Sequence, residues 1–102
     1  MPTLEEALQY LGIDYDDDMV KANVNRALST AQQVLYGAVG RDVEVYLPND
    51  PRIKELVLIY LDDLYSERGA SAKVSGAVRR LVFDMELQLR LELRQAKEDD
   101  EA

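Results

Sequence analysis

The sequence predicts a small all-α domain, a bundle of about four helices with a short first helix, two long core helices and a long last helix. Three observations predict this class. Apolar residues recur at three- and four-residue spacing in four segments, helix-capping residues precede these segments, and glycines follow three of them. With 102 residues, 47% of them apolar and 31% charged, the chain can bury one modest core. We therefore expect a single helical domain over 1–97 and an acidic disordered tail over 98–102.

Residues 4–11 are predicted to form the first helix. Thr3 and Glu6 have the spacing of a capping box, in which the side chain of each residue pairs with the backbone amide of the other. Gly12 is placed to end the helix in a left-handed conformation. The apolar residues of this segment are Leu4, Ala7, Leu8 and Leu11.

Residues 17–39 are predicted to form the second helix. The aspartates at 14, 16, 17 and 18 can cap its free amides and lie at the positive end of its dipole. Gly40 is its natural end, and alanines and valines on its apolar side allow a neighbouring helix to approach closely. That side carries Val20, Val24, Ala27, Ala31 and Val34 or Leu35.

Residues 41–50 are longer than a usual helix connection. Val43, Val45 and Leu47 alternate with Glu44 and Tyr46, which allows a short extended piece. The segment is either an extended arm that contacts a neighbouring molecule or an ordinary surface loop, and the surface loop is favoured. In the first case, the candidate contact residues are Val43, Val45 and Tyr46.

Residues 51–68 are predicted to form the third and most apolar helix, which we place centrally. Asp50 followed by Pro51 is typical of a helix start, and Gly69 is placed to end the helix. The small residues of 70–76 make a linker, in which Ser75 can cap the next helix. The apolar face comprises Ile53, Leu56, Val57, Tyr60, Leu61 and Leu64, and it is widened by Leu58, Ile59 and Tyr65.

Residues 77–97 can be interpreted in two ways. Apolar and polar residues alternate strictly over 85–94, which is a strand pattern. The same run consists of strong helix formers without a β-branched residue, and Glu86 and Arg90 form a favourable i,i+4 pair. We therefore favour a helix.

As a helix, this segment carries two apolar stripes on nearly opposite faces, about 160° apart. One stripe can pack on the two long core helices. The other needs a cover, which is either a second subunit or further helices of the same chain, and a subunit is favoured. The first stripe is Leu81, Met85, Leu89 and Leu93, and the second is Phe83, Leu87 and Leu91, our main candidate contact residues.

Composition excludes several classes of function. The chain has no cysteine and no histidine, so it has no disulfide, no thiolate or imidazole metal site and no Ser-His or Cys-His catalytic arrangement. We expect no enzyme activity, no cofactor and no metal. A net charge of −8 disfavours sequence-specific nucleic-acid binding. No apolar run reaches the roughly 18–20 residues of a membrane span, and the acidic start lacks a basic targeting signal, so we expect a cytoplasmic protein.

For three short motifs we favour a structural role over a functional site. Asp14, Asp16 and Asp18 match the first ligands of a calcium loop, but Met19 and Asn25 stand where that loop needs glycine and glutamate, so helix capping is favoured. The glycines at 69 and 76 around Lys73 lack the spacing of a phosphate loop. Adjacent carboxylates at 5–6 and 62–63 point about 100° apart on a helix and share no site.

The order of these features resembles the head-tail connector proteins of tailed phages. The likeness consists of the opening residues 4–14, the acidic run at 16–18, the helix that closes at Gly40 and the helix that opens with 51–54. Residues 88–90 match the glutamine-leucine-arginine part of the signature for which this family is sometimes named. The glycine that usually follows the signature is Leu91 here. The resemblance covers about residues 3–90.

The resemblance implies a helical adaptor that assembles into a ring of about a dozen subunits beneath the portal of a phage capsid. Such a ring would extend the DNA channel and contact the portal and a stopper or tail-completion protein. It would occupy the virion, and the host cytoplasm during assembly. The alternative is a cytoplasmic helical binding module or small regulator that engages one partner through the same stripe. A DNA-binding regulator is a third, disfavoured hypothesis.

Overall fold

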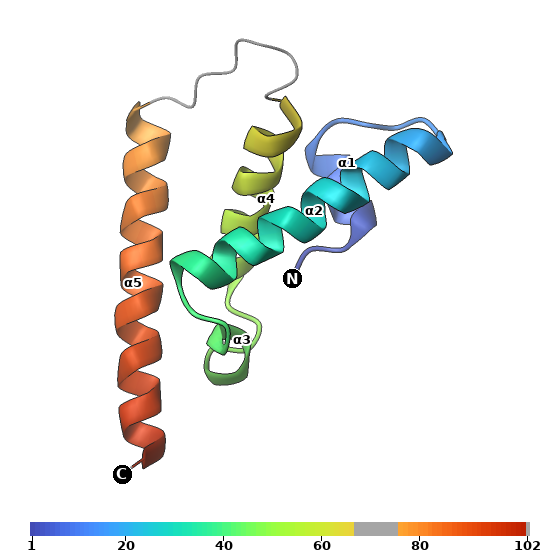
Figure 1. Ribbon diagram of the computed structural model, residues 1–102. Helices are drawn as coiled ribbons and strands as arrows, with labels where there is room; N and C mark the ends of the chain where they lie inside the picture. Colours follow the sequence, from blue (N-terminus) through green and yellow to red (C-terminus); the bar gives the residue numbers. More distant parts are fainter. Residues whose placement is uncertain (67–75, 102) are drawn as a thin grey trace.

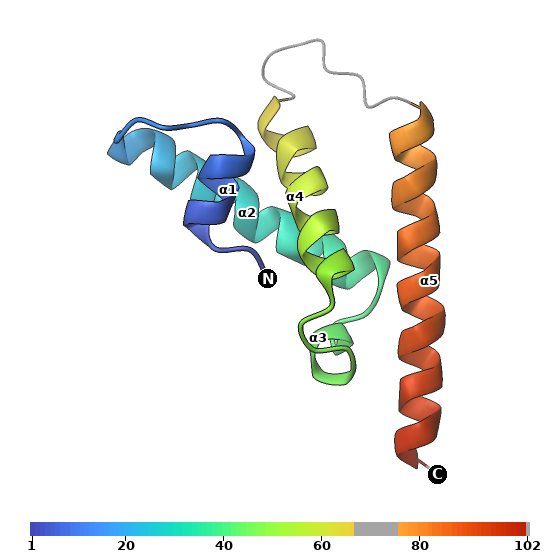
Figure 2. The same ribbon diagram turned by 180° about the vertical axis from the view of Figure 1, so that it is seen from behind.

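The computed structural model describes residues 1–66 and 76–101, which form five helices and no strand (Figures 1 and 2). The predicted all-α class is therefore confirmed for this part of the chain. The predicted helix end at Gly69, the cap Ser75 and the linker up to residue 75 lie outside the described residues.

Helix α1 spans Leu4–Tyr10 and has both predicted ends. The Thr3 amide donates to Glu6 Oε1 and the Glu6 amide donates to Thr3 Oγ1, each at 3.1 Å, which completes the capping box. At the other end Gly12 has φ +76°, and the Ile13 amide donates to the Leu8 carbonyl at 2.9 Å. This pattern is a Schellman motif, which brings Leu8 and Ile13 together.

Helix α2 spans Asp18–Ala38 and crosses α4 obliquely (Figure 1). Asp17 caps it by accepting from the Met19 amide at 2.9 Å and the Val20 amide at 3.1 Å. Of the two predicted alternatives at its end, Leu35 is buried and Val34 is exposed. The buried residues of α2 are Val24, Leu28, Ala31 and Leu35, of which Leu28 was not predicted.

Helix α3 spans Val43–Tyr46, so the extended arm is wrong, and the connection 41–50 contains one helical turn instead. The Asp42 carbonyl accepts from the amides of Val45 at 3.0 Å and Tyr46 at 3.2 Å, which closes a helical turn. The turn persists because Val43 is fully buried in the core and because the Tyr36 hydroxyl donates to Glu44 at 2.5 Å. Val43 therefore cannot contact a partner.

Helix α4 spans Pro51–Ser66 and lies centrally, as predicted, with α1, α2 and α5 packed against it. Asn49 adopts φ 60°, a left-handed conformation that asparagine tolerates, and turns the chain into the helix. Asp50 accepts from the Arg52 amide at 2.9 Å. The predicted apolar face is buried at Ile53, Leu56, Val57 and Leu61, and Leu58 is buried beside it.

Helix α5 spans Gly76–Glu101 and confirms the helical interpretation of the alternating segment. It runs antiparallel to α4 and continues past it to α3 (Figures 1 and 2). The predicted disordered tail is wrong for 98–101, because the helix continues to Glu101, and residue 102 lies outside the described residues. Three contacts hold this end: Gln95 donates to Asp99 at 3.0 Å, Lys97 pairs with Asp42 at 2.7 Å, and Tyr46 lies 3.5 Å from Asp100.

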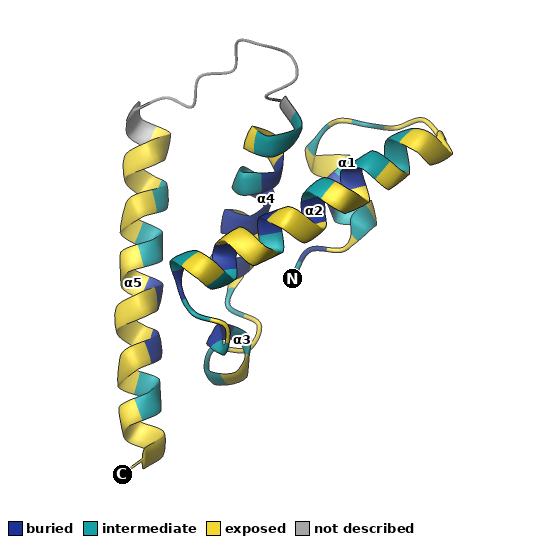
Figure 3. Cartoon of the chain, in the orientation of Figure 1, coloured by how far each residue is buried: buried dark blue, intermediate teal, exposed yellow. Residues whose placement is uncertain are grey.

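The core lies between α2 and α4, which make the most extensive contact of any two helices in the described chain. Each fully buried leucine there stabilises the fold by about 1.5–3 kcal/mol. The molecule measures 50 × 29 × 18 Å, so its thin direction holds no more than two helix layers. Because α5 lies at one side of this thin body, one of its faces stays uncovered (Figure 3).

Candidate protein-interaction surface

The two apolar stripes of α5 have different environments. Leu89 and Leu93 are buried against the rest of the chain and Met85 is half-buried beside them. The second stripe, which we call the outer stripe, is exposed: Phe83 by 59%, Leu87 by 40% and Leu91 by 55%. Figure 3 shows the buried positions of α5 on the side that faces α2 and α3. The alternative in which the same chain covers both stripes is therefore wrong for the described residues.

Leu81 does not join the buried stripe to which it was assigned, and it is exposed. Eight residues of α-helix separate it from Leu89, which rotates its side chain by about 80° around the axis. The buried side of α5 is instead completed by Val82, which packs against the core. Leu81 thus adds apolar surface to the exposed part of α5.

Arg52 anchors α5 to the first turn of α4. Its Nη1 and Nη2 lie 2.6 Å and 2.8 Å from the two carboxylate oxygens of Glu92, and Nη2 also donates to Asp50 at 2.7 Å. Because the guanidinium binds both carboxylate oxygens, the contact fixes the orientation of Glu92 relative to Arg52 as well as the distance between them. The guanidinium lowers the pKa of the Asp50 and Glu92 carboxyls, chiefly through these hydrogen bonds.

Tyr60 makes a second polar contact with α5 by donating its hydroxyl to Glu86. Burial, and then this hydrogen bond, raise the pKa of Tyr60 above its ordinary value. The tyrosine therefore stays protonated and remains a donor to Glu86. Sequence reasoning missed the pairs Tyr60–Glu86 and Arg52–Glu92, because their members lie 26 and 40 residues apart and no local pattern links them.

Gly40 sets how closely α5 approaches the end of α2. A Cβ at this position would lie 2.8 Å from Leu93 Cδ2, closer than such atoms normally come. Gly40 also has φ +142°, which residues with a side chain rarely adopt. The glycine predicted to end the second helix thus also makes space for a buried leucine of α5.

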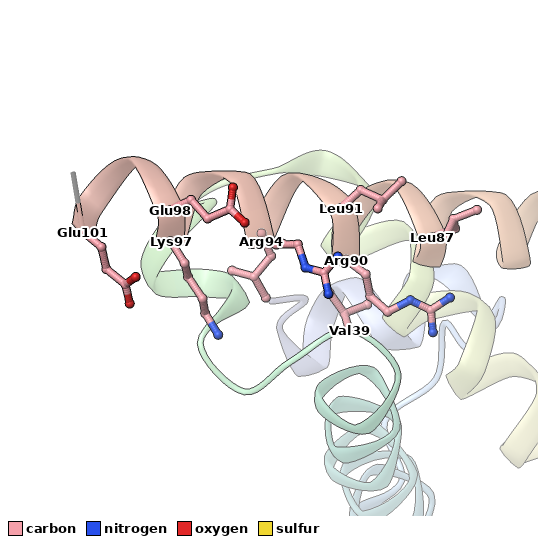
Figure 4. Close-up of a pocket in the computed structure, with 9 residues that line it drawn as sticks. Val39, Leu87, Arg90, Leu91, Arg94, Lys97, Glu98 and Glu101 are labelled. Atoms are coloured by element: carbon pink, nitrogen blue, oxygen red, sulfur yellow. The ribbon is translucent and has the colours of Figure 1, made fainter.

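A shallow hollow of about 520 Å³ lies between α5 and Val39, at the end of α2. Figure 4 shows the side chains around this hollow, which include Val39, the outer-stripe residues Leu87 and Leu91, and the basic Arg90, Arg94 and Lys97. Arg90 Nη1 lies 3.4 Å from the Ala38 carbonyl, at the negative end of the α2 dipole. Because Glu98 and Glu101 also line the hollow, the surface beside Leu87 and Leu91 carries charges of both signs.

The other predicted contact residues, which belong to α3, differ in how far they are buried. Val45 is exposed on α3, whereas Tyr46 is half-buried and its hydroxyl lies 3.5 Å from Asp100. Val43 belongs to the core. The structure therefore retains Phe83, Leu87, Leu91 and Val45 as apolar side chains that a partner can reach.

Of the carboxylates at 14, 16 and 18 that resembled a calcium loop, only that of Asp16 forms an ion pair within the described residues. Asp16 pairs with Lys21 at 2.5 Å, which lowers the pKa of Asp16, and Asp17 caps α2. Within 1–66 and 76–101, no group of three or more metal-ligating side chains is suited to hold an ion. In the same part of the chain, no helix has both the length and the apolar character needed to cross a bilayer.

Comparison with known proteins adds no identification, since no family model, no curated protein and no solved structure matches the chain. The surface on α5 is therefore interpreted from its geometry and from the resemblance of the sequence. The surface is an exposed apolar row on a helix whose opposite side is buried, and such rows are typical of protein contacts.

Proposed function

We propose that the protein is a non-enzymatic assembly subunit, a head-tail connector of a tailed phage that forms a ring beneath the portal and joins the capsid to the tail. The observation that carries the assembly role is the exposed outer stripe of α5, Phe83, Leu87 and Leu91, on a helix whose inner side is buried. The phage setting comes from the resemblance of residues 3–90 to the connector family.

The anchoring of α5 supports this role. A helix that must present a contact surface loses less entropy on binding when it is already held in place. Leu89 and Leu93 bury its inner side, and Arg52 and Tyr60 bind Glu92 and Glu86. The outer stripe is therefore presented on an ordered helix.

The charge of the chain is compatible with a channel wall. At −8, a ring of these subunits repels the phosphate backbone and would let DNA pass without binding it. Half of this excess, −4, lies within residues 84–102. A lumen lined mainly by basic side chains would contradict this part of the proposal.

The test compares two variants with substitutions at equally exposed apolar sites. Leu87 is 40% exposed on α5 and Val34 is 41% exposed on α2. We expect the variant that carries both Leu87→Asp and Leu91→Asp to form no ring, either by itself or on purified portal. The contact would bury two carboxylates without partners, which is unfavourable. Val34→Asp should assemble like the wild type. Light scattering measures assembly, and circular dichroism checks that helical content is kept.

Two outcomes would overturn the proposal. If the double variant loses its helical content, the outer stripe belongs to the fold and not to a contact. If the wild type neither forms cyclic assemblies nor binds the portal, a regulator that engages one partner helix is supported instead, since the i,i+4 spacing of the stripe also suits a groove-binding helix.

A further inference from the structure

The two leucines of the outer stripe belong to a longer row of exposed residues on α5, which we call the α5 seam. Its members follow one another in alternating steps of four and three residues, the a and d spacing of a two-stranded coiled coil. At 100° per residue they lie within about 80° of one another around the helix axis. Figure 3 shows that this side of α5 is exposed. The seam consists of Arg80, Asp84, Leu87, Leu91, Arg94 and Glu98, all of them exposed.

The order of charges along the α5 seam is complementary to its own reverse. From first to last, the seam is positive, negative, apolar, apolar, positive and negative. A second copy that runs in the opposite direction therefore places a negative charge level with each positive one and a leucine level with each leucine. The level pairs are Arg80 with Glu98, Asp84 with Arg94 and Leu87 with Leu91, and each pair occurs twice about the two-fold axis.

Other ways of pairing two α5 seams fit the charges less well. A parallel pair in register places every charge opposite the same charge, which is repulsive. Shifting the antiparallel pair by seven residues in either direction places both leucines level with charged residues. An antiparallel pair centred on Leu87 brings Asp84 against Arg90 but also Arg80 against Arg94, so attraction and repulsion offset each other. Only the register that sets leucine against leucine pairs every seam charge with an opposite one.

The charges of the α5 seam are available for such a contact. Arg80, Asp84, Arg94 and Glu98 form no ion pair within the described residues. In the antiparallel pair they lie at both ends of the seam, while the leucines lie at its centre. This arrangement, an apolar centre with a polar rim, is usual in protein contacts, and it leaves the ion pairs partly in water.

Two further charges lie near the α5 seam. Arg90 of one copy would approach Arg90 of the other beside the two-fold axis, but its guanidinium already lies against α2, where Nη1 is 3.4 Å from the Ala38 carbonyl. Glu101 continues the spacing of the seam three residues after Glu98 and adds negative charge close to Arg80 of the other copy. Attraction therefore outweighs repulsion, and a second copy of this chain fits the seam better than an unrelated helix.

We propose that two copies of the free protein pair through their α5 seams, antiparallel about a two-fold axis, with Leu87 and Leu91 at the centre of the contact. This inference goes beyond the proposed function, because it concerns the protein before it meets the portal. A contact about a two-fold axis closes at two copies and cannot by itself build a ring. If the outer stripe forms the ring contacts, the pair must open first, so pairing competes with ring formation in the free protein.

The test reverses the charges of one pair of levels, singly and together. Arg80→Glu alone and Glu98→Arg alone each bring like charges together twice in the dimer. We expect each single variant to dimerise at least about fivefold more weakly than the wild type. The variant with both changes again sets opposite charges level with each other, so it should regain most of the lost affinity. Sedimentation equilibrium measures the dissociation constant of each dimer.

Two controls make the same changes of charge outside the α5 seam. They are Arg26→Glu on α2 and Glu55→Arg on α4, at exposed positions that form no ion pair within the described chain. Both should dimerise like the wild type. Circular dichroism checks that every variant keeps its helical content. Raising the salt concentration should reduce the differences between the variants, because the seam charges are exposed.

Three results would overturn the antiparallel pair. They are a wild type that stays monomeric up to about 1 mM, single variants that dimerise as tightly as the wild type, and a double variant no tighter than the single ones. The proposed function is judged separately, by ring formation and binding to the portal. A wild type that forms rings on the portal but never pairs when free would leave that function in place and overturn the pair. A wild type that pairs as described but neither forms rings nor binds the portal would overturn only the proposed function.

Discussion

The packing between α2 and α4 differs from the packing of α5 in the contacts that hold each in place. Leu35, Leu56 and Leu61 of the first pair are fully buried in one apolar core. Helix α5 contributes Leu89 and Leu93 to that core, packs Val82 and Met85 against it, and is also held by polar side chains at its edge. The fold therefore depends mainly on the packing of α2 against α4, whereas α5 is docked on this pair and leaves one apolar face exposed.

The largest expected effect is the loss of a core leucine. Leu56→Ala should reduce the free energy of unfolding by about 2–5 kcal/mol, because it removes apolar contacts and leaves a cavity. Leu91→Ala, on the outer stripe, should change it by no more than about 0.5 kcal/mol in the monomer. Urea denaturation at low protein concentration measures both. Equal losses would show that the outer stripe is also part of the core.

A smaller effect is expected where α5 meets the end of α2. Gly40→Ala should lower the free energy of unfolding by about 1–3 kcal/mol, because the added methyl group contacts Leu93 and the positive φ strains an alanine. Hydrogen exchange should then be faster in α5 than in α2. Gly37→Ala is the control, since no atom lies within 4 Å of its Cβ, and it should stabilise the helix by up to about 1 kcal/mol. Equal exchange in both helices would contradict a separately docked α5.

The smallest expected effect is on the stability of the protein at acidic pH. The folded-state pKa values of Asp50 and Glu92 are lowered, so their contribution to stability is complete above the ordinary carboxyl pKa of about 4. It is lost as the pH falls through the lowered values. Glu92→Gln should lower the free energy of unfolding by up to about 1 kcal/mol near neutral pH. Its melting temperature should also fall less than that of the wild type between about pH 5 and 2.

Glu55→Gln serves as the control for the acid experiment, because Glu55 is exposed on α4 and forms no ion pair within the described chain. Its pH profile should follow that of the wild type. An unchanged profile for Glu92→Gln would show that the Arg52 contact does not hold α5 in solution.

Local rules predicted much of the fold. The caps at Thr3, Asp17 and Asp50 depend on side chains within three residues of the amides they bind, and all three are present. The helical form of 85–94 also followed from residue type, although the alternation of apolar residues indicates a strand. Periodicity then separated the two stripes of α5 correctly, except at Leu81.

The features that sequence reasoning missed depend on tertiary contacts. The segment with Val43 and Val45 alternates like a strand, but burial of Val43 favours a helical turn there. The acidic end of α5 has no apolar anchor in the sequence, yet Lys97 and Asp100 contact α3 and the residue before it.

The contacts of α5 with Gly40, Arg52 and Asp42 together determine where the helix lies along its own axis. Shifting α5 by one turn, about 5.4 Å, would place Leu89 or Lys97 at Gly40 in place of Leu93. The same shift would separate Glu92 from Arg52 and Lys97 from Asp42. Three contacts along the helix thus specify one axial position. The position of Phe83, Leu87 and Leu91 relative to the rest of the fold is therefore fixed along the helix axis as well.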